Sequence, residues 1–229
     1  MKAAERTVVV GDLHGCLEEL ERLLDAVGFT ARDRLIAVGD LVGKGPDGAG
    51  VVRFLRTGGH EAVRGNHDAK LLAARRGERD RPLGAKHRAH AEAMDDADWA
   101  WLDGLPPWLQ LPDHGAIVVH GGLVPGVPLE AQDPDVVTNL RSIRPDGTPS
   151  QRVDEGEPWA KHWPGPELVI FGHDAIRGLQ RWEHAVGLDT GCVYGLELSA
   201  LMLPDRRIVS VPSAHDYAGG GAPSLEKEP

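Results

Sequence analysis

Aspartate, asparagine and histidine follow short apolar runs at five places in the chain, usually beside glycine. These places are Gly11-Asp12-Leu13-His14, Gly39-Asp40, Gly65-Asn66-His67-Asp68, His120-Gly121-Gly122 and Gly172-His173-Asp174. Each one alone is typical of a turn or of a helix N-cap. The carboxyl ends of strands form the ligand crevice of an open α/β sheet, so we expect the five to converge. Their carboxylate, amide and imidazole groups suit hard or borderline divalent metals, and the ordered set predicts a dinuclear metal site.

The glycine-rich segment GDLVGKGPDG, residues 39–48, contains a single lysine and suggests a phosphate site. A P-loop would need four residues between its glycines and a serine or threonine after the lysine; Gly39 and Gly43 are one residue too close, and Gly45 follows Lys44. A dinucleotide-binding pattern is present, but its acidic partner belongs at the end of the next strand, and Glu61 lies at the start. Neither motif gives Asp40 a role, whereas the metal site does.

Strand-like and helix-like segments alternate along the chain, which is typical of an α/β protein. We expect strands at 7–10, 35–38, 61–64, 117–119, 168–171 and 185–187, and a closing hairpin at 196–211. Helices are expected at 17–27, where leucines recur with helical spacing, and at 49–56 and 70–76. We therefore predict a single domain over residues 1–212.

Two segments depart from this alternation. Residues 77–112 are rich in charge, tryptophan and alanine, and several of their arginines and lysines continue a basic stripe that begins at Arg75. We interpret them as a small helical insert, which is either a lid or a solvated helical face. Residues 213–229 are polar and rich in glycine and proline, which predicts a flexible C-terminal tail.

The overall composition excludes several classes of protein. The chain has 229 residues and a net charge of −10, which argues against general nucleic-acid binding and against affinity for membrane surfaces. No apolar run is long enough to span a membrane, and the first residues do not form a signal peptide. Two cysteines are too few for a disulfide framework, so we expect a cytoplasmic protein. An anionic substrate stays compatible with the negative charge, because bound metal inverts the local field.

The motifs GDLHG, GDLVGKGP, RGNHD, HGG and GHD resemble those of the calcineurin-like metallophosphoesterases, and within them the phosphoprotein phosphatase superfamily. The resemblance covers residues 8 to about 203, most of the chain. Lys44, the FGHDA stretch at 171–175 and the GLDTGCVYG stretch at 187–195 are similar to the ApaH-like phosphatases, relatives of the symmetrical diadenosine tetraphosphatases. This resemblance implies an α/β (α+β) fold, a four-layer αββα sandwich with a small helical insert.

The same resemblance implies a role for each candidate residue. It assigns Asp12 and His14 to a first metal, Asp40 to both metals, and Asn66, His120 and His173 to a second metal. His67 would be the general acid, Lys44 and Arg141 would bind the phosphate, and Arg64 would lie nearby. The two divalent ions are expected to be manganese, with iron, cobalt and zinc as alternatives. The aspartate that usually orients the catalytic histidine would fall at Gly43, so Asp68 or a backbone carbonyl would have to orient His67.

The function implied is hydrolysis of nucleotide polyphosphates such as diadenosine tetraphosphate, by direct in-line attack of metal-bound hydroxide. The alternative is a phosphoprotein (Ser/Thr or Tyr) phosphatase that uses the same site. Capped RNA is a third possible substrate, because a cap is also a nucleotide polyphosphate. A degenerate site used only for binding is disfavoured, because all six ligand positions hold suitable residues. Composition and motifs do not indicate an oligomeric state.

Overall fold

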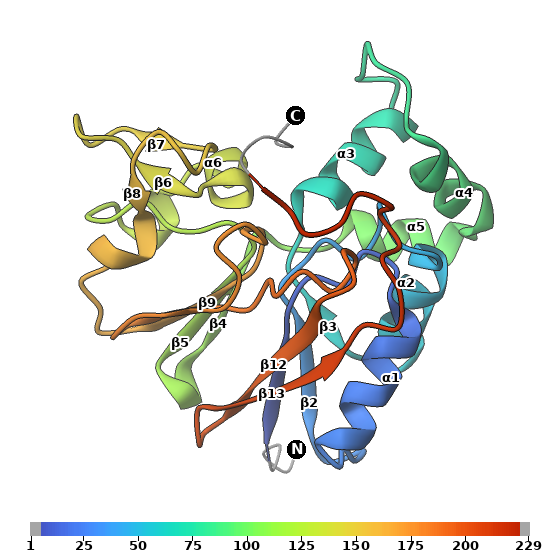
Figure 1. Ribbon diagram of the computed structural model, residues 1–229, viewed down its shortest axis with the longest axis horizontal. Coiled ribbons are helices and arrows are strands. Elements are labelled where there is room, and N and C mark those ends of the chain that lie inside the picture. Colours follow the sequence, from blue (N-terminus) through green and yellow to red (C-terminus); the bar gives the residue numbers. More distant parts are fainter. Residues whose placement is uncertain (1–5, 225–229) are drawn as a thin grey trace.

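The computed structural model of the protein describes residues 6–224 and contains two five-stranded sheets packed face to face (Figure 1). The first sheet has the order β13-β12-β1-β2-β3, formed by Arg207–Pro212, Glu197–Leu203, Thr7–Val10, Arg34–Ala37 and Glu61–Ala62. Strands β1, β2 and β3 are parallel, and the hairpin β12–β13 joins antiparallel to β1. The parallel part brings the carboxyl ends of three strands to one edge of the sheet.

The second sheet has the order β10-β11-β9-β5-β4, formed by Gln180–Arg181, Ala185–Gly187, Leu168–Phe171, Ala116–Val119 and Trp108–Leu111. Strands β11, β9 and β5 are parallel, and the short edge strands β10 and β4 are antiparallel to their neighbours. A small third sheet, β7-β6-β8, is formed by Pro149–Ser150, Ser142–Ile143 and Glu157–Pro158. The predicted mixture of strands and helices is therefore confirmed.

Alternation along the strands divides the apolar core into layers. In β1, Val9 faces the second sheet and packs with Val118 and Ile170, whereas Val8 and Val10 face the helices. Helices α1 (Leu17–Ala26) and α2 (Gly48–Thr57) cover that outer face. The outer face of the second sheet is covered by α6 (Pro134–Asn139) and the 3-10 helix η3 (Trp159–His162). The layers are therefore helix, sheet, sheet and helix, as the resemblance implies.

The segment expected to be a helical insert, 77–112, contains two helices and a strand. Helix α4 spans Ala85–Ala93 and α5 spans Asp96–Asp103, and both pack against α2. Its last residues form β4, an edge strand whose partner β5 lies outside the segment and could not be recognised from local pattern. Short 3-10 helices follow at Pro112–His114 and Leu129–Ala131.

Helix α3, Asn66–Arg75, begins four residues earlier than the sequence pattern indicates. The Asp68 carboxylate accepts the backbone N–H of Gly65 at 2.9 Å and that of Leu41 at 3.0 Å. This buried carboxylate caps the helix and ties it to the loop after β2. The strand predicted at 61–64 is correspondingly shorter, and it ends at Ala62.

Residues 214–217, which belong to the predicted flexible tail, lie against α1. Ala214 N–H and the Tyr217 hydroxyl both donate to the Glu19 carboxylate at 3.0 Å, and Asp216 forms an isolated bridge with Tyr194. The buried Glu19 side chain provides a partner that composition alone does not reveal. Flexibility of the tail stays a prediction, and residues 225–229 lie outside the described residues. None of the described helices has the length and apolar character needed to cross a membrane.

Candidate metal centre and active site

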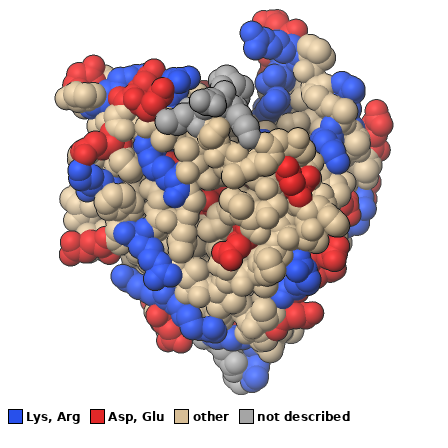
Figure 2. Space-filling model, viewed as in Figure 1, with Lys and Arg blue, Asp and Glu red and all other residues tan. Residues whose placement is uncertain are grey.

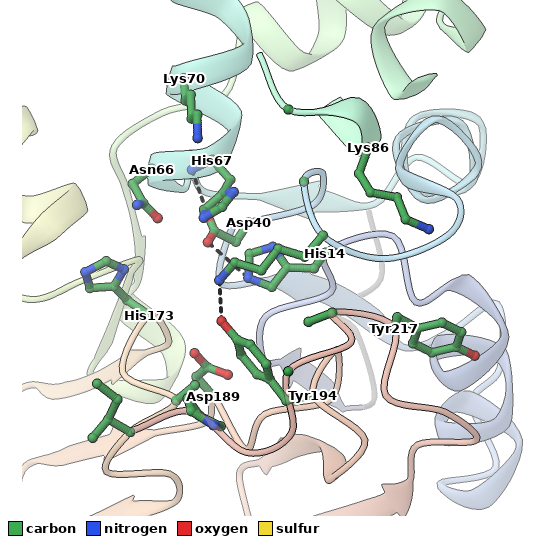
Figure 3. Close-up of a pocket in the computed structure, with 18 of the residues that line it drawn as sticks. His14, Asp40, Asn66, His67, Lys70, Lys86, His173, Asp189, Tyr194 and Tyr217 are labelled. Atoms are coloured by element: carbon green, nitrogen blue, oxygen red, sulfur yellow. Dashed lines mark hydrogen bonds and ion pairs between the residues drawn. The ribbon is translucent and has the colours of Figure 1, made fainter. Parts of the chain in front are cut away.

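The predicted ligands come together where the carboxyl ends of the two sheets meet. The loops after β1 and β2 supply Asp12, His14 and Asp40 from the first sheet, and the loops after β5 and β9 supply His120 and His173 from the second. Asn66 is the first residue of α3. Figure 3 shows Asp40, His14, Asn66 and His173 around one cavity. Residues more than 160 positions apart in the chain are in contact here, since the His173 N–H donates to Asp12 Oδ1 at 3.0 Å.

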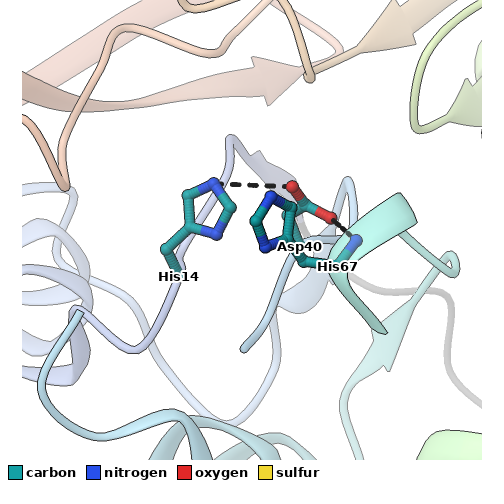
Figure 4. Close-up of side chains that lie close together, drawn as sticks. All are labelled: His14, Asp40 and His67. Atoms are coloured by element: carbon teal, nitrogen blue, oxygen red, sulfur yellow. Dashed lines mark hydrogen bonds and ion pairs between the residues drawn. The ribbon is translucent and has the colours of Figure 1, made fainter. Parts of the chain in front are cut away.

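Asp40 lies at the centre of the cluster. Its Oδ2 is 3.4 Å from His14 Nε2, and its Oδ1 is 3.4 Å from His120 Nε2. Asp40 belongs to two groups whose potential ligand atoms all lie within 4.8 Å of one another, one with His14 and His67 and the other with Asp12 and His120. Figure 4 shows the first group, in which the Asp40 carboxylate also accepts the His67 N–H at 2.8 Å. The geometry allows one carboxylate to serve two cations.

Backbone carbonyls orient the imidazole rings of His14 and His120. His14 Nδ1 lies 3.1 Å from the Val42 carbonyl, and His120 Nδ1 lies 2.9 Å from the Val38 carbonyl. A carbonyl only accepts, so each Nδ1 carries the proton and each Nε2 presents a lone pair to the site. His120 Nε2 is then 3.1 Å from Asn66 Oδ1, which is also an acceptor. A shared cation suits these facing acceptors better than a hydrogen bond does.

Three of the predicted ligands adopt left-handed backbone conformations. The φ angles are 46° at His14, 50° at Asp40 and 69° at His173. Non-glycine residues seldom adopt this conformation, and such strain concentrates at functional sites. The neighbouring Gly172 is needed for a different reason, because a Cβ there would lie 1.9 Å from Asp12 Oδ1. The glycine therefore allows the His173 backbone to reach Asp12.

Burial places several carboxylates in an environment that disfavours their charge. Burial raises the pKa of Asp12 well above its ordinary value, and the charges of Asp189 and Asp40 raise it further. Burial likewise raises the pKa of Asp40 to about 7 and that of Asp189 to about 6. Burial lowers the pKa of His120 to about 4, so this imidazole is neutral and able to bind metal. Bound cations would offset the cost of burying these charged carboxylates. The carboxylate, amide and imidazole groups present are suitable ligands for divalent cations.

Lys44 extends into the cavity and contacts a residue that the sequence analysis did not assign. Its Nζ donates to the Tyr194 hydroxyl at 2.5 Å and lies 4.9 Å from the centre of that ring. Burial favours the neutral amine, but Tyr194 and the charges of Asp40 and Asp189 outweigh it and raise the pKa of Lys44. Asp189 directly follows an apolar run, so the signal that identifies Asp12 and Asp40 could have found it.

Arg141 lines the same cavity, whose volume is about 820 Å³. Its guanidinium donates to the His173 carbonyl at 3.1 Å and to the Gln151 carbonyl at 3.2 Å, which holds the side chain beside the ligand cluster. Arg64 is placed differently. Its guanidinium donates to the Asp103 carbonyl, and it lines a second cavity rather than the larger one.

His67 receives a partner from the insert. Its Nδ1 lies 3.1 Å from His87 Nε2 of α4, and the two rings stack with an interplanar angle of 15°. Asp68 caps α3 and is not that partner. Gly43, where related enzymes place an aspartate, has a φ of 129°, and a Cβ there would lie 2.6 Å from His67 Nδ1. Nothing in the local sequence indicates His87, because its approach depends on how the insert folds back.

The fold and the ligand cluster define the class of protein. The chain matches the calcineurin-like phosphoesterase family over residues 5–215 and belongs to it. The predicted resemblance to metallophosphoesterases is thereby confirmed, and the chain is a phosphoester hydrolase by family.

Within this family, the chain is similar to two tetraphosphatases and to one crystal structure. A symmetrical bis(5'-nucleosyl)-tetraphosphatase from Aromatoleum aromaticum is 31% identical, over 88% of this chain and 95% of its own length. An asymmetrical bis(5'-nucleosyl)-tetraphosphatase from Oceanobacillus iheyensis is 26% identical, over 91% of this chain and 93% of its own length. A crystal structure described as a "putative diadenosine tetraphosphatase" has a TM-score of 0.85 and 44% identity, and it covers 93% of this chain and 95% of that one.

Proposed function

We propose that the protein hydrolyses dinucleoside polyphosphates such as diadenosine tetraphosphate, with two divalent cations. The observation that carries this proposal is the position of Asp40, whose carboxylate faces His14 on one side and His120 on the other beside a cavity of about 820 Å³. Relatives at 26% and 31% identity that are named tetraphosphatases support the substrate class.

The residues that would hold the cations are those that converge on Asp40. Asp12 and His14 would bind one cation, Asn66, His120 and His173 would bind the other, and Asp40 would bind both. We propose manganese for the purified enzyme, and iron, cobalt or zinc would also suit these donors. When bound, the two cations would supply an activated water and neutralise phosphate charge.

Side chains of the protein would bind the phosphate and donate the proton. Lys44 and Arg141 would bind the non-bridging oxygens of the attacked phosphate, where negative charge must be stabilised. His67 would donate a proton to the leaving oxygen, and its ring lies edge-on to His14 with centroids 4.8 Å apart. As a general acid His67 would act in its doubly protonated form, in which His87 Nε2 would accept the Nδ1–H and the Nε2–H would be the proton given to the leaving oxygen.

The alternative function, a phosphoprotein phosphatase, has weaker support. The protein serine/threonine and tyrosine phosphatases among the structural neighbours are 12% and 15% identical to this chain, which is evidence for the fold alone. Hydrolysis of capped RNA and a cytoplasmic location stay predictions.

Product analysis tests the proposal. The manganese-loaded protein is incubated with diadenosine tetraphosphate and the nucleotides are separated by chromatography. We expect ADP as the main product, which means symmetrical cleavage. AMP and ATP in equal amounts would mean asymmetrical cleavage by the same class of enzyme. Intact substrate, from protein that still cleaves p-nitrophenyl phosphate, would overturn the proposed substrate class and direct attention to phosphopeptides.

A further inference from the structure

A second cavity, of about 630 Å³, lies between α3 and α6 beside the metal centre. Asn66, Lys70 and Asn139 line both this cavity and the larger one, so the two adjoin at the end of α3 that carries Asn66. Figure 3 shows Lys70 one turn along α3 from Asn66. A ligand bound at the metal centre could therefore extend in two directions.

Positive charge dominates the second cavity. Among the described residues that line it, Arg64, Lys70 and Arg79 carry positive charge and Asp135 carries the one carboxylate. Over residues 6–224, neither Lys70 nor Arg79 forms an ion pair with a carboxylate. Within the part of the chain that the structure describes, the Nε atoms of Arg64 and Arg79 are buried and have no hydrogen-bond partner. Burial lowers the pKa of Lys70, and the positive charges of Arg79 and Lys44 lower it further.

Neighbouring arginines, in contrast, form ion pairs with carboxylates. Arg75 pairs with Asp96 at 3.6 Å, Arg76 pairs with Asp103, and Arg53 pairs with Asp98 at 2.7 Å. In the space-filling view, basic side chains also gather on the α3 side of the notch at the top of the molecule (Figure 2). Unpaired cations grouped in a cavity repel one another, and buried donors without acceptors are unfavourable, so this group is suited to an anion.

We propose that the second cavity is a subsite for phosphate groups of the substrate beyond the phosphate that is attacked, bound by Arg64, Lys70 and Arg79. This inference rests on the proposed function. A dinucleoside polyphosphate attacked at an internal phosphorus carries phosphates on both sides, so it needs two openings from the metal centre. A phosphomonoester needs only one. The ligand class is therefore a linear polyphosphate chain.

Arg79→Ala tests the subsite, because Arg79 lies in the loop after α3 and is not one of the candidate metal ligands. We compare kcat/KM for diadenosine tetraphosphate with kcat/KM for p-nitrophenyl phosphate, which reports on the metal centre alone. Because Arg79 would form charge-assisted hydrogen bonds to phosphate, its loss should lower the ratio of kcat/KM for diadenosine tetraphosphate to that for p-nitrophenyl phosphate about tenfold or more. The change should arise mainly from KM. Arg79→Lys should recover part of the loss. The matched control is Arg81→Ala, an exposed arginine two residues away that lines neither cavity.

A second measurement separates this inference from the proposed function. Inorganic tripolyphosphate is titrated as an inhibitor of p-nitrophenyl phosphate hydrolysis. A Ki that rises about tenfold in Arg79→Ala and in Lys70→Ala supports the subsite, even if the wild-type protein leaves diadenosine tetraphosphate intact. Equal Ki values and an equal substrate ratio in the wild-type, Arg79→Ala and Arg81→Ala proteins would overturn the subsite, whichever nucleotide is cleaved.

Discussion

Among single residues, Asp40 is in contact with both halves of the candidate metal centre. We expect Asp40→Asn to lower metal content and to reduce hydrolysis by more than the 10² to 10³ that is typical of losing one electrostatic donor. The fold should persist, because an amide retains an acceptor for the His67 N–H. Without metal the variant should be at least as stable as the wild type, since burial raises the pKa of Asp40 to about 7 and disfavours its charge.

Metal analysis, activity and thermal unfolding measured on the same preparations test this prediction. Near-normal activity with two metals per chain would exclude a bridging role for Asp40. A metal-free variant that unfolds well below the metal-free wild type would show that the carboxylate has a structural role instead.

His87 is the residue-scale feature that local sequence does not reveal. If His87 holds His67 in place, His87→Ala should lower kcat about tenfold for nucleotide substrates. This loss is smaller than the rate enhancement of about 10²–10⁴ that a general acid typically contributes. The loss should be much smaller for 2,4-dinitrophenyl phosphate, whose leaving group needs no proton. His87→Gln keeps an acceptor and should recover activity. His162→Ala, a surface histidine paired with Glu157, is the control. Equal losses on both substrates would indicate a general structural defect.

At the scale of elements, one buried carboxylate of the insert pairs with two arginines of helix α2. Asp98 of α5 has a fully buried side chain and accepts from Arg53 at 2.7 Å and Arg56 at 3.0 Å, both on α2. Asp98→Asn should lower the free energy of unfolding by about 1–3 kcal/mol, less than a wholly buried pair because both arginines are partly exposed. Urea unfolding measures this. Asp96→Asn, fully exposed on the same helix, should change stability by less than about 0.5 kcal/mol.

The sequence could predict those elements that have a local signal, but not the contacts that depend on tertiary folding. The strands that precede Asp12, Asp40 and His173 were predictable, because an apolar β-branched run that ends at glycine is a local signal. The contact between His67 and His87 was not predictable, because it depends on the folding of the insert across 20 residues. The same holds for Lys44 and Tyr194, which are 150 residues apart. Edge strand β4 was missed because its pairing with β5 is a tertiary property.

At the scale of the whole molecule, charge is distributed unevenly. The chain carries a net charge of −10, yet Lys44, Arg141, Lys70 and Arg79 line the two cavities that adjoin the metal centre. The net negative charge disfavours general binding of nucleic acid, while the cations that line the two cavities attract a short polyphosphate.

The buried carboxylates link the metal centre to the stability of the whole molecule. In metal-free protein, burial raises the pKa of Asp40 and of Asp68 to about 7 and that of Asp189 to about 6, above an ordinary value of 3.8. Between the ordinary and the raised values the folded state binds more protons than the unfolded state, so stability is lost as the pH rises from about 4 to about 7. Cations bound to Asp40 would oppose that loss, and they bind more tightly as their ligands lose protons.

We therefore expect the Tm difference between manganese-loaded and chelator-treated protein to grow from pH 5 to pH 8. For a chain of this length each kcal/mol shifts Tm by about 2–4 °C, and an increase of about 5 °C or more is expected. Calorimetry at the two pH values, with and without chelator, measures it. The Asp40→Asn variant should show little increase, because its metal affinity is low at both values. An equal Tm difference at pH 5 and pH 8 in the wild type would mean that these carboxylates are not coupled to metal binding.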